Sequence, residues 1–226
     1  LADMEEVGIL LDQERLAEVR VEVAERLAVC VQRCHEIVGR SFKVGSTKEL
    51  QRILFEEMGY TPIKKTKTGF STDSSVLEKL SGLQSPDLPS SVLEYRMLSK
   101  LLSTYLAKLP TYVQADGRIR TSLKQAVAAT GRLASADPNL QNIPIRTVEG
   151  RRIRACFVPP AGSVFLSADY SQVELRVLAH CCESSTLRDA FLAGEDIHTR
   201  TASEVFGVPG PEVTGDVRSA AKAINF

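Results

Sequence analysis

The chain has 226 residues, enough for one large domain or two, and its 43% apolar content is sufficient for a packed core. It carries 28 basic and 28 acidic residues, so its net charge of zero provides no overall field that favours nucleic acid or an acidic partner. No secretory leader and no apolar run near the length of about 18 residues is visible, so no membrane partner is expected.

Five cysteines occur, at positions 30, 34, 156, 181 and 182. No two of them form a Cys-x-x-Cys pair, so their spacing is unlike a zinc site and indicates buried free thiols in a reducing compartment. The sequence begins at Leu1 and stops at Phe226 within a helical pattern, which we interpret as a piece of a longer protein.

Charge is distributed unevenly despite the neutral sum. Acidic side chains dominate residues 1–36, whereas basic side chains dominate residues 118–154. The basic members are Arg118, Arg120, Lys124, Arg132, Arg146, Arg151, Arg152 and Arg154. A polyanion would favour the second region, although a solvated basic surface explains the same pattern.

The first half of the chain is predicted to be helical. Apolar residues recur at three- and four-residue steps across residues 14–38, and Gly39 ends that helix. Ser46 and Glu49 have the spacing of a capping box for a helix that runs to about residue 58.

Two more helices are predicted beyond a lysine-rich loop. Residues 59–69 form the loop, whose lysines either contact phosphate or remain solvated. The helices span residues 71–80 and 91–109, and Pro110 closes the second one.

After Pro110 the pattern becomes mixed. Residues 115–117, Ala-Asp-Gly, predict a hairpin turn, and residues 117–129 are predicted to be extended. Residues 153–158 are predicted as a strand.

The C-terminal part is again helical in pattern. Helices are predicted at residues 187–192 and 197–206, the second capped by Asp196. A last helix places Arg218, Lys222 and Phe226 on one face.

Residues 163–180 combine a predicted strand, an acid and a helix. The strand ends at Asp169, and the helix opens at Ser171, which has capping-box spacing to Glu174. A carboxylate at the end of a strand can bind a divalent cation, and the Lys and Arg side chains and His198 complement phosphate charge. The residues alone therefore indicate phosphate or nucleotide chemistry.

Four ordered motifs resemble the family A DNA polymerases of the bacterial DNA polymerase I type. Residues 169–176, Asp-Tyr-Ser-Gln-Val-Glu-Leu-Arg, are similar to motif A of that family. Residues 130–133 and 137–144 resemble its upstream palm signature. Residues 196–199 match the segment between the motifs, and residues 218–226 resemble the first half of motif B.

The resemblance implies an α+β fold with a helical thumb beside an antiparallel palm sheet. Residues 1–11 are expected to be a palm-edge or linker segment, and residues 12–110 the thumb. Residues 111–195 would then form the first part of the palm, and residues 196–226 the start of the fingers.

The implied activity is template-directed DNA synthesis, in which deoxynucleotides are added to a primer 3′ end by two-metal phosphoryl transfer. Two Mg²⁺ ions are the expected cofactors, and primer–template DNA and deoxynucleoside triphosphates are the expected partners. Asp169 matches a catalytic, metal-binding aspartate, and the backbone carbonyl of Tyr170 matches a further metal ligand.

Nucleotide-binding roles follow from the same resemblance. His198, Arg218 and Lys222 match residues that grip the incoming triphosphate, and Lys222 also matches a catalytic position. Phe226 matches the ring that stacks on the nucleotide. Glu174 matches a residue that excludes ribonucleotides at the sugar 2′ position, a role that is compatible with capping.

DNA contacts are implied in the palm signature. Arg132 matches an arginine that reaches the minor groove, where acceptors common to all base pairs allow pair shape to be tested. Gln141, Asn142 and Arg146 match positions near primer and template, whereas Asn139 either contacts DNA or holds its loop.

The family's second metal-binding aspartate belongs to a later motif that this chain does not contain. If the protein ends at Phe226, we expect it to be catalytically incompetent, and a non-catalytic fragment that binds primer–template DNA is the alternative function. A two-metal nuclease would need acids clustered around Asp169, which the sequence does not supply. A monomeric, cytoplasmic, nucleoid-associated bacterial protein is expected.

Overall fold

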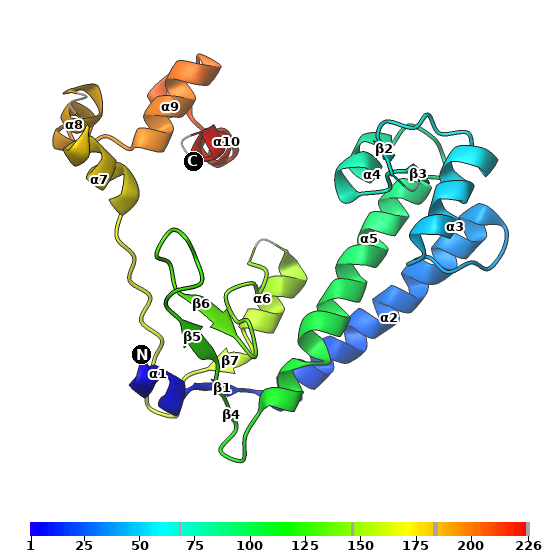
Figure 1. Cartoon of the computed structure of the whole chain (residues 1–226), viewed down its shortest axis with the longest axis horizontal. Coiled ribbons are helices and arrows are strands. Elements are labelled where there is room, and N and C mark those ends of the chain that lie inside the picture. Colours follow the sequence, from blue (N-terminus) through cyan, green and yellow to red (C-terminus); the bar gives the residue numbers. More distant parts are fainter. Residues whose placement is uncertain (68, 146, 183–184, 225–226) are drawn as a thin grey trace. The chain divides into compact units, whose positions relative to one another are not determined.

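The computed structural model describes residues 1–67, 69–145, 147–182 and 185–224 (Figure 1). These residues form two compact units, Leu1–Phe165 and Leu166–Phe226. Helices dominate, and the described strands form small antiparallel sheets. The predicted α+β class is therefore confirmed, whereas the predicted thumb, palm and fingers boundaries stay predictions.

A three-stranded antiparallel sheet lies at the base of the first unit. It is built from β4 (Arg118–Ile119), β1 (Ile9–Leu11) and β7 (Phe157–Val158), in that order. The helix α1 (Ala2–Val7) precedes β1, and Gly8 joins them at a φ of 63°. A side chain at Gly8 would place its Cβ 2.6 Å from the Ile119 carbonyl oxygen, so only glycine fits there.

Two long helices, α2 (Gln13–Val38) and α5 (Leu88–Leu101), pack side by side (Figure 1). The Asp12 side chain caps α2 by accepting from the Arg15 N–H at 3.0 Å, and Gly39 ends it, so the predicted helix 14–38 is confirmed. The helix predicted at residues 91–109 corresponds to α5 and to the π-helical turn that continues it, η2 (Leu102–Leu106). A 3₁₀ turn, η3 (Leu109–Tyr112), follows.

A second core lies at the far end of these helices, in the part of the chain predicted as helices and a lysine loop. Its elements are α3 (Thr47–Arg52), the π-helical turn η1 (Ile53–Glu57), β2 (Lys65–Thr66), β3 (Gly69–Phe70) and α4 (Ser74–Leu80). Ser46 caps α3 by accepting from the Glu49 N–H at 3.3 Å, but the Glu49 carboxylate accepts from the Lys43 N–H at 3.0 Å. Only half of the predicted capping box therefore forms.

Residues 113–158 connect the helices back to the sheet through β5 (Ser122–Lys124), β6 (Ala134–Ala136) and α6 (Val148–Arg154). The predicted hairpin turn is confirmed, because the Gln114 N–H donates to the Arg118 carbonyl at 2.9 Å. The prediction of an extended segment at 117–129 holds only for β4 and β5. The strand predicted at 153–158 is confined to β7, because Thr147 caps α6 and keeps Ile153 in that helix.

The second unit consists of α7 (Val173–Cys181), α8 (Ser185–Leu192), α9 (Ile197–Phe206), the 3₁₀ turn η4 (Gly210–Glu212) and α10 (Gly215–Ile224). Leu175, Ala190 and Ile197 form its small core. Asp196 caps α9 by accepting from the Thr199 N–H at 2.8 Å, which confirms the cap predicted from the sequence.

The strand predicted at residues 163–169 is wrong. Val164 and Leu166 are 86% and 90% exposed, and no described strand pairs with this segment. A strand is stable only where a neighbour supplies hydrogen bonds and covers its apolar side chains, and none of the described residues does so here. The predicted cap at Ser171 is wrong too, because α7 begins after Gln172, which has a left-handed φ of 53°.

No helix in the described part of the chain has both the length and the apolar character needed to cross a membrane.

Candidate nucleotide and nucleic-acid sites

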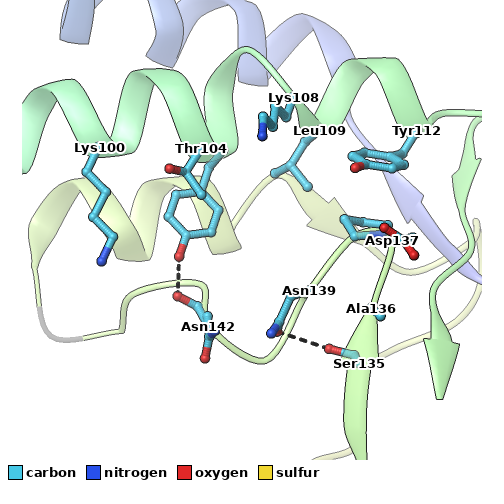
Figure 2. Close-up of a pocket in the computed structure, with 12 residues that line it drawn as sticks. Lys100, Thr104, Lys108, Leu109, Tyr112, Ser135, Ala136, Asp137, Asn139 and Asn142 are labelled. Atoms are coloured by element: carbon cyan, nitrogen blue, oxygen red, sulfur yellow. Dashed lines mark hydrogen bonds between the residues drawn. The ribbon is translucent and has the colours of Figure 1, made fainter. Parts of the chain in front are cut away.

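A cavity of about 740 Å³ lies in the first unit between residues 100–112 and residues 135–142 (Figure 2). Lys100, Thr104 and Lys108 line it from the helical side, at four-residue steps along α5 and its continuation, and all three are exposed. Ammonium, hydroxyl and amide groups around such a cavity are the donors that bind a sugar–phosphate backbone.

The loop that forms the other wall is held by its own side chains. The Ser135 hydroxyl accepts from the N–H groups of Leu140 at 3.1 Å and Gln141 at 3.3 Å. Gln141 accepts from the Ser135 N–H at 2.8 Å through Oε1 and donates to the Leu133 carbonyl at 3.0 Å through Nε2. The Asn139 Oδ1 accepts from the Ser135 hydroxyl at 3.2 Å and from the Gln141 N–H at 3.1 Å (Figure 2).

Tyr105 fastens this loop to the helical wall. Its side chain is 5% exposed, and its hydroxyl donates a short hydrogen bond to the Asn142 carbonyl. Burial raises the pKa of the Tyr105 phenol, so it remains a neutral donor. The exposed Asn142 side chain is thereby held at the cavity.

These contacts bear on the predicted DNA-binding residues. Of the two roles left open for Asn139, holding the loop is the one that the structure contains. Gln141 uses both amide atoms on its own loop, so a DNA contact by this side chain stays a prediction. Arg132 is exposed shortly before β6, and Arg146 lies outside the described residues.

Several arginines of the basic region 118–154 are engaged inside the first unit. Arg152 Nη1 lies 2.5 Å from Oε2 of Glu22 on α2, and Arg120 Nη2 lies 2.7 Å from Oδ2 of Asp116. Arg120 holds the pKa of the Asp116 carboxyl down at about 2. The Arg152–Glu22 pair therefore joins the acidic first segment to the basic later one, whereas Arg120 is neutralised by a carboxylate four residues away.

In the second unit, the side chains predicted to bind a triphosphate gather around Asp196. Arg218 forms a two-point ion pair with Asp196, with Nε 3.2 Å from Oδ1 and Nη2 2.7 Å from Oδ2. Gln172 adds a third side-chain donor, with Nε2 3.0 Å from Oδ2. The Arg218 guanidinium holds the pKa of the Asp196 carboxyl well below its usual range.

His198 is the second residue of α9, next to this cluster, and is only 3% exposed. Burial lowers the pKa of its imidazole, the positive charges of Arg218 and Lys222 lower it further, and Asp196 opposes them. The imidazole is therefore neutral near pH 7. The exposed Lys222 lies one helical turn after Arg218 on α10, so both cations project from the same face.

The remaining predicted residues lie before or at the start of α7, or at the end of the chain. Asp169 and Tyr170 are exposed in the segment that precedes α7, and Glu174 lies in its first turn. Phe226 lies outside the described residues. Within residues 1–67, 69–145, 147–182 and 185–224, no three His, Cys, Asp or Glu side chains gather as a metal site.

Sequence reasoning missed some residues of these sites. Lys100, Thr104 and Lys108 were detectable, because their four-residue spacing marks one polar face of a predicted helix. Asp196 was predicted only as a cap, and its pairing with Arg218, twenty-two positions away, has no local signal.

Comparison with known proteins identifies the fold and the family. Residues 13–226 match DNA polymerase family A. The chain is 49% identical to DNA polymerase I of Pseudomonas aeruginosa and 46% identical to that of Geobacillus stearothermophilus, and the alignments include the whole chain. It spans 25% and 26% of those two relatives, about a quarter of their length.

A solved relative matches in structure as well. The POL domain of Pol1 from M. smegmatis, in complex with DNA primer-template and dNTP, is 40% identical and superposes with a TM-score of 0.89. The match covers 99% of this chain and 40% of that one. The motifs, the fold and these matches agree, and the chain belongs to DNA polymerase family A.

Proposed function

We propose that the protein to which this chain belongs adds deoxynucleotides to a primer 3′ end as a template directs. The observation that supports this best is the match of nearly the whole chain to a polymerase domain solved with primer-template and dNTP. The two candidate sites described above have the chemistry that those two ligands need.

The incoming dNTP would bind at the second unit. Arg218 and Lys222 supply positive charge for the triphosphate, and His198 supplies a neutral imidazole beside them. Phe226 would stack on the nucleotide, and Glu174 would exclude the ribose 2′-hydroxyl. Lys222 would also assist catalysis at the phosphate being transferred.

Two Mg²⁺ ions are the proposed cofactors. The Asp169 carboxylate and the Tyr170 backbone carbonyl are hard oxygen donors on an exposed segment, which suits an ion that keeps several water ligands. When bound, such ions make the primer hydroxyl a better nucleophile and offset charge on the departing pyrophosphate. The second aspartate of the pair would come from outside this chain.

Primer–template DNA would bind at the first unit. Lys100, Lys108 and Thr104 would face phosphate, and Asn142 would lie close to the primer or template strand. Arg132 would probe base-pair shape from the minor groove, and Arg146 would contact the same DNA. This assignment corresponds to residues 12–110 as thumb, 111–195 as palm and 196–226 as the start of the fingers, in a monomeric enzyme of the bacterial nucleoid.

Primer extension tests the proposal. The full protein that contains this chain is mixed with labelled primer–template, the four dNTPs and Mg²⁺, and elongation is followed on a sequencing gel. Template-dependent elongation supports the proposal. Salt-sensitive binding of the same DNA without elongation would support the non-catalytic binding function instead.

The DNA site has its own test. Replacing Lys100 and Lys108 by alanine removes two phosphate contacts, so the slope of log Kd against log salt should fall by about two. The control replaces Arg20 and Lys79, two exposed cations that do not line the cavity, and should leave the slope close to that of the wild type. An unchanged slope in the first variant would remove the cavity from the DNA site.

A further inference from the structure

Asp196 connects the start of α7 with α9 and α10. Its Oδ1 accepts from the Thr199 N–H at 2.8 Å and from Arg218 Nε at 3.2 Å. Its Oδ2 accepts from Arg218 Nη2 at 2.7 Å and from Gln172 Nε2 at 3.0 Å. One carboxylate therefore holds the cap of α9, a cation on α10 and an amide immediately before α7.

The pair with Asp196 fixes the orientation of the Arg218 side chain. A guanidinium group has two edges that can each form a two-point contact, one through Nε and Nη2 and one through Nη1 and Nη2. Asp196 occupies the first edge. The plane of the group is thereby set, and the second edge retains the geometry that a phosphate requires.

Ligand binding gives a reason for this arrangement besides stability. The side chains of Arg218 and Asp196 are 42% and 37% exposed, and solvent screens ion pairs at such exposure strongly. An oriented guanidinium is more useful for ligand binding, because a charged group held in place loses less conformational freedom when the ligand arrives.

Gln172 extends the connection toward Asp169. It has a φ of 53°, a left-handed conformation that a residue with a side chain adopts only when its surroundings impose it. Its amide reaches Asp196 from this position. The segment that carries Asp169 and Tyr170 is therefore tied, three residues after Asp169, to the carboxylate that orients Arg218.

We infer that Asp196 is a positioning residue, which presents the second edge of Arg218 to the triphosphate of the incoming dNTP and, through Gln172, ties that cation to the Asp169 segment. The identity of the ligand rests on the proposed function. The positioning itself rests on the contacts of Asp196 alone.

The variant Asp196→Asn tests the inference in a polymerase that contains this chain. Asparagine retains an oxygen that can cap α9 but loses the charge and one acceptor. We expect the KM for dNTP to rise about tenfold, as for the loss of one charge-assisted contact, while the affinity for primer–template stays unchanged. Glu204→Gln is the matched control, because it removes a carboxylate that pairs with Arg200 at 2.9 Å on the same helix without contacting Arg218.

A double-mutant cycle separates positioning from a general structural role. If Asp196 acts through Arg218, then Asp196→Asn changes the KM of the Arg218→Ala enzyme by less than about twofold. Equal effects in both backgrounds, or no effect in the wild type, would overturn the inference. Gln172→Ala leaves the cap and the ion pair in place and should raise the KM about threefold, which keeps the test valid if Asp196→Asn fails to fold.

A measurement without catalysis distinguishes this inference from the proposed function. In the 226-residue chain, the Nε–H resonance of Arg218 is followed by ¹⁵N NMR, assigned with Arg218→Lys, and dTTP with Mg²⁺ is added. Positioning is supported if the Arg218 Nε–H exchanges slowly with solvent in the wild type and in Glu204→Gln but rapidly in Asp196→Asn. The Nε–H resonance should also shift when dTTP is added. Fast exchange in the wild-type chain contradicts it, whether or not the polymerase extends primers.

Discussion

Two buried tyrosines of the first unit should respond in opposite ways to loss of their hydroxyl groups. Tyr60 and Tyr105 are 3% and 5% exposed. The Tyr105 hydroxyl donates to the Asn142 carbonyl, whereas the Tyr60 hydroxyl has no hydrogen-bond partner in the described part of the chain. Burial raises the pKa of both phenols, so both variants replace a neutral group.

The magnitudes follow from hydrogen bonding. Tyr105→Phe leaves the Asn142 carbonyl without its partner and should lower the free energy of unfolding by about 1 kcal/mol. Tyr60→Phe removes a hydroxyl that was desolvated without compensation, so it should raise the free energy of unfolding by about 1 kcal/mol. Since each change deletes one oxygen atom from a buried ring, each variant is the control for the other.

Urea unfolding followed by circular dichroism measures both effects, and m-values equal to that of the wild type would confirm that the change lies in stability. Tyr105→Phe should also weaken primer–template binding, because it releases the loop that bears Asn142, and Tyr60→Phe should not. Equal destabilisation by the two changes, or a neutral Tyr105→Phe, would refute this reasoning.

Three further predictions concern the second unit. Asp169→Ala should abolish DNA synthesis by the polymerase and leave primer–template affinity within about twofold in a filter-binding assay, since only the proposed metal site loses a charge; near-normal turnover would exclude Asp169 from that proposed site. Glu174→Ala should relax the exclusion of ribonucleotides, measured as the ratio of kcat/KM for dNTP and rNTP, and an unchanged ratio would contradict its proposed role at the sugar. Burial lowers the pKa of His198 in the folded protein, so the imidazole of the unfolded chain takes up a proton first as the pH falls below about 6.5. The free energy of unfolding should therefore decrease as the pH falls, until the pH is below the pKa of the folded state. Urea midpoints between pH 5 and 8 should show this decrease in the wild type and a smaller one in His198→Gln.

The parts of the fold that could be predicted are those with local causes. The apolar period and the cap of α2 lie within its own sequence, and the same is true of the Asp196 cap of α9. The strand expected at residues 163–169 required information that its own residues lack, because strand pairing depends on distant partners. The Thr147 cap was a local signal, and it would have placed α6 correctly.

The candidate sites also combine features that local sequence predicts with contacts between distant segments that it does not. Helical spacing placed Arg218 and Lys222 on one face from the sequence alone. The contact between Arg218 and Asp196 joins two helices, and the contact between Tyr105 and Asn142 joins a helix to a loop, so neither follows from any sequence period. The resemblance to a family implied roles for Arg218, Lys222 and Asn142 but not the contacts that hold them.

The π-helical turn η2 accommodates one extra residue between α5 and the sequence that follows. Its Ala107 N–H bonds to the Leu102 carbonyl, five residues back, so the turn holds one residue more than an α-helical turn. Each residue of an α-helix advances about 100° around the axis, and Tyr105 and Leu106 are consecutive and yet both buried. Since the turn absorbs that extra residue, Lys108 lies close to the angle that a residue seven positions after Lys100 would have in an unbroken α-helix, and the polar face that lines the cavity continues past the turn.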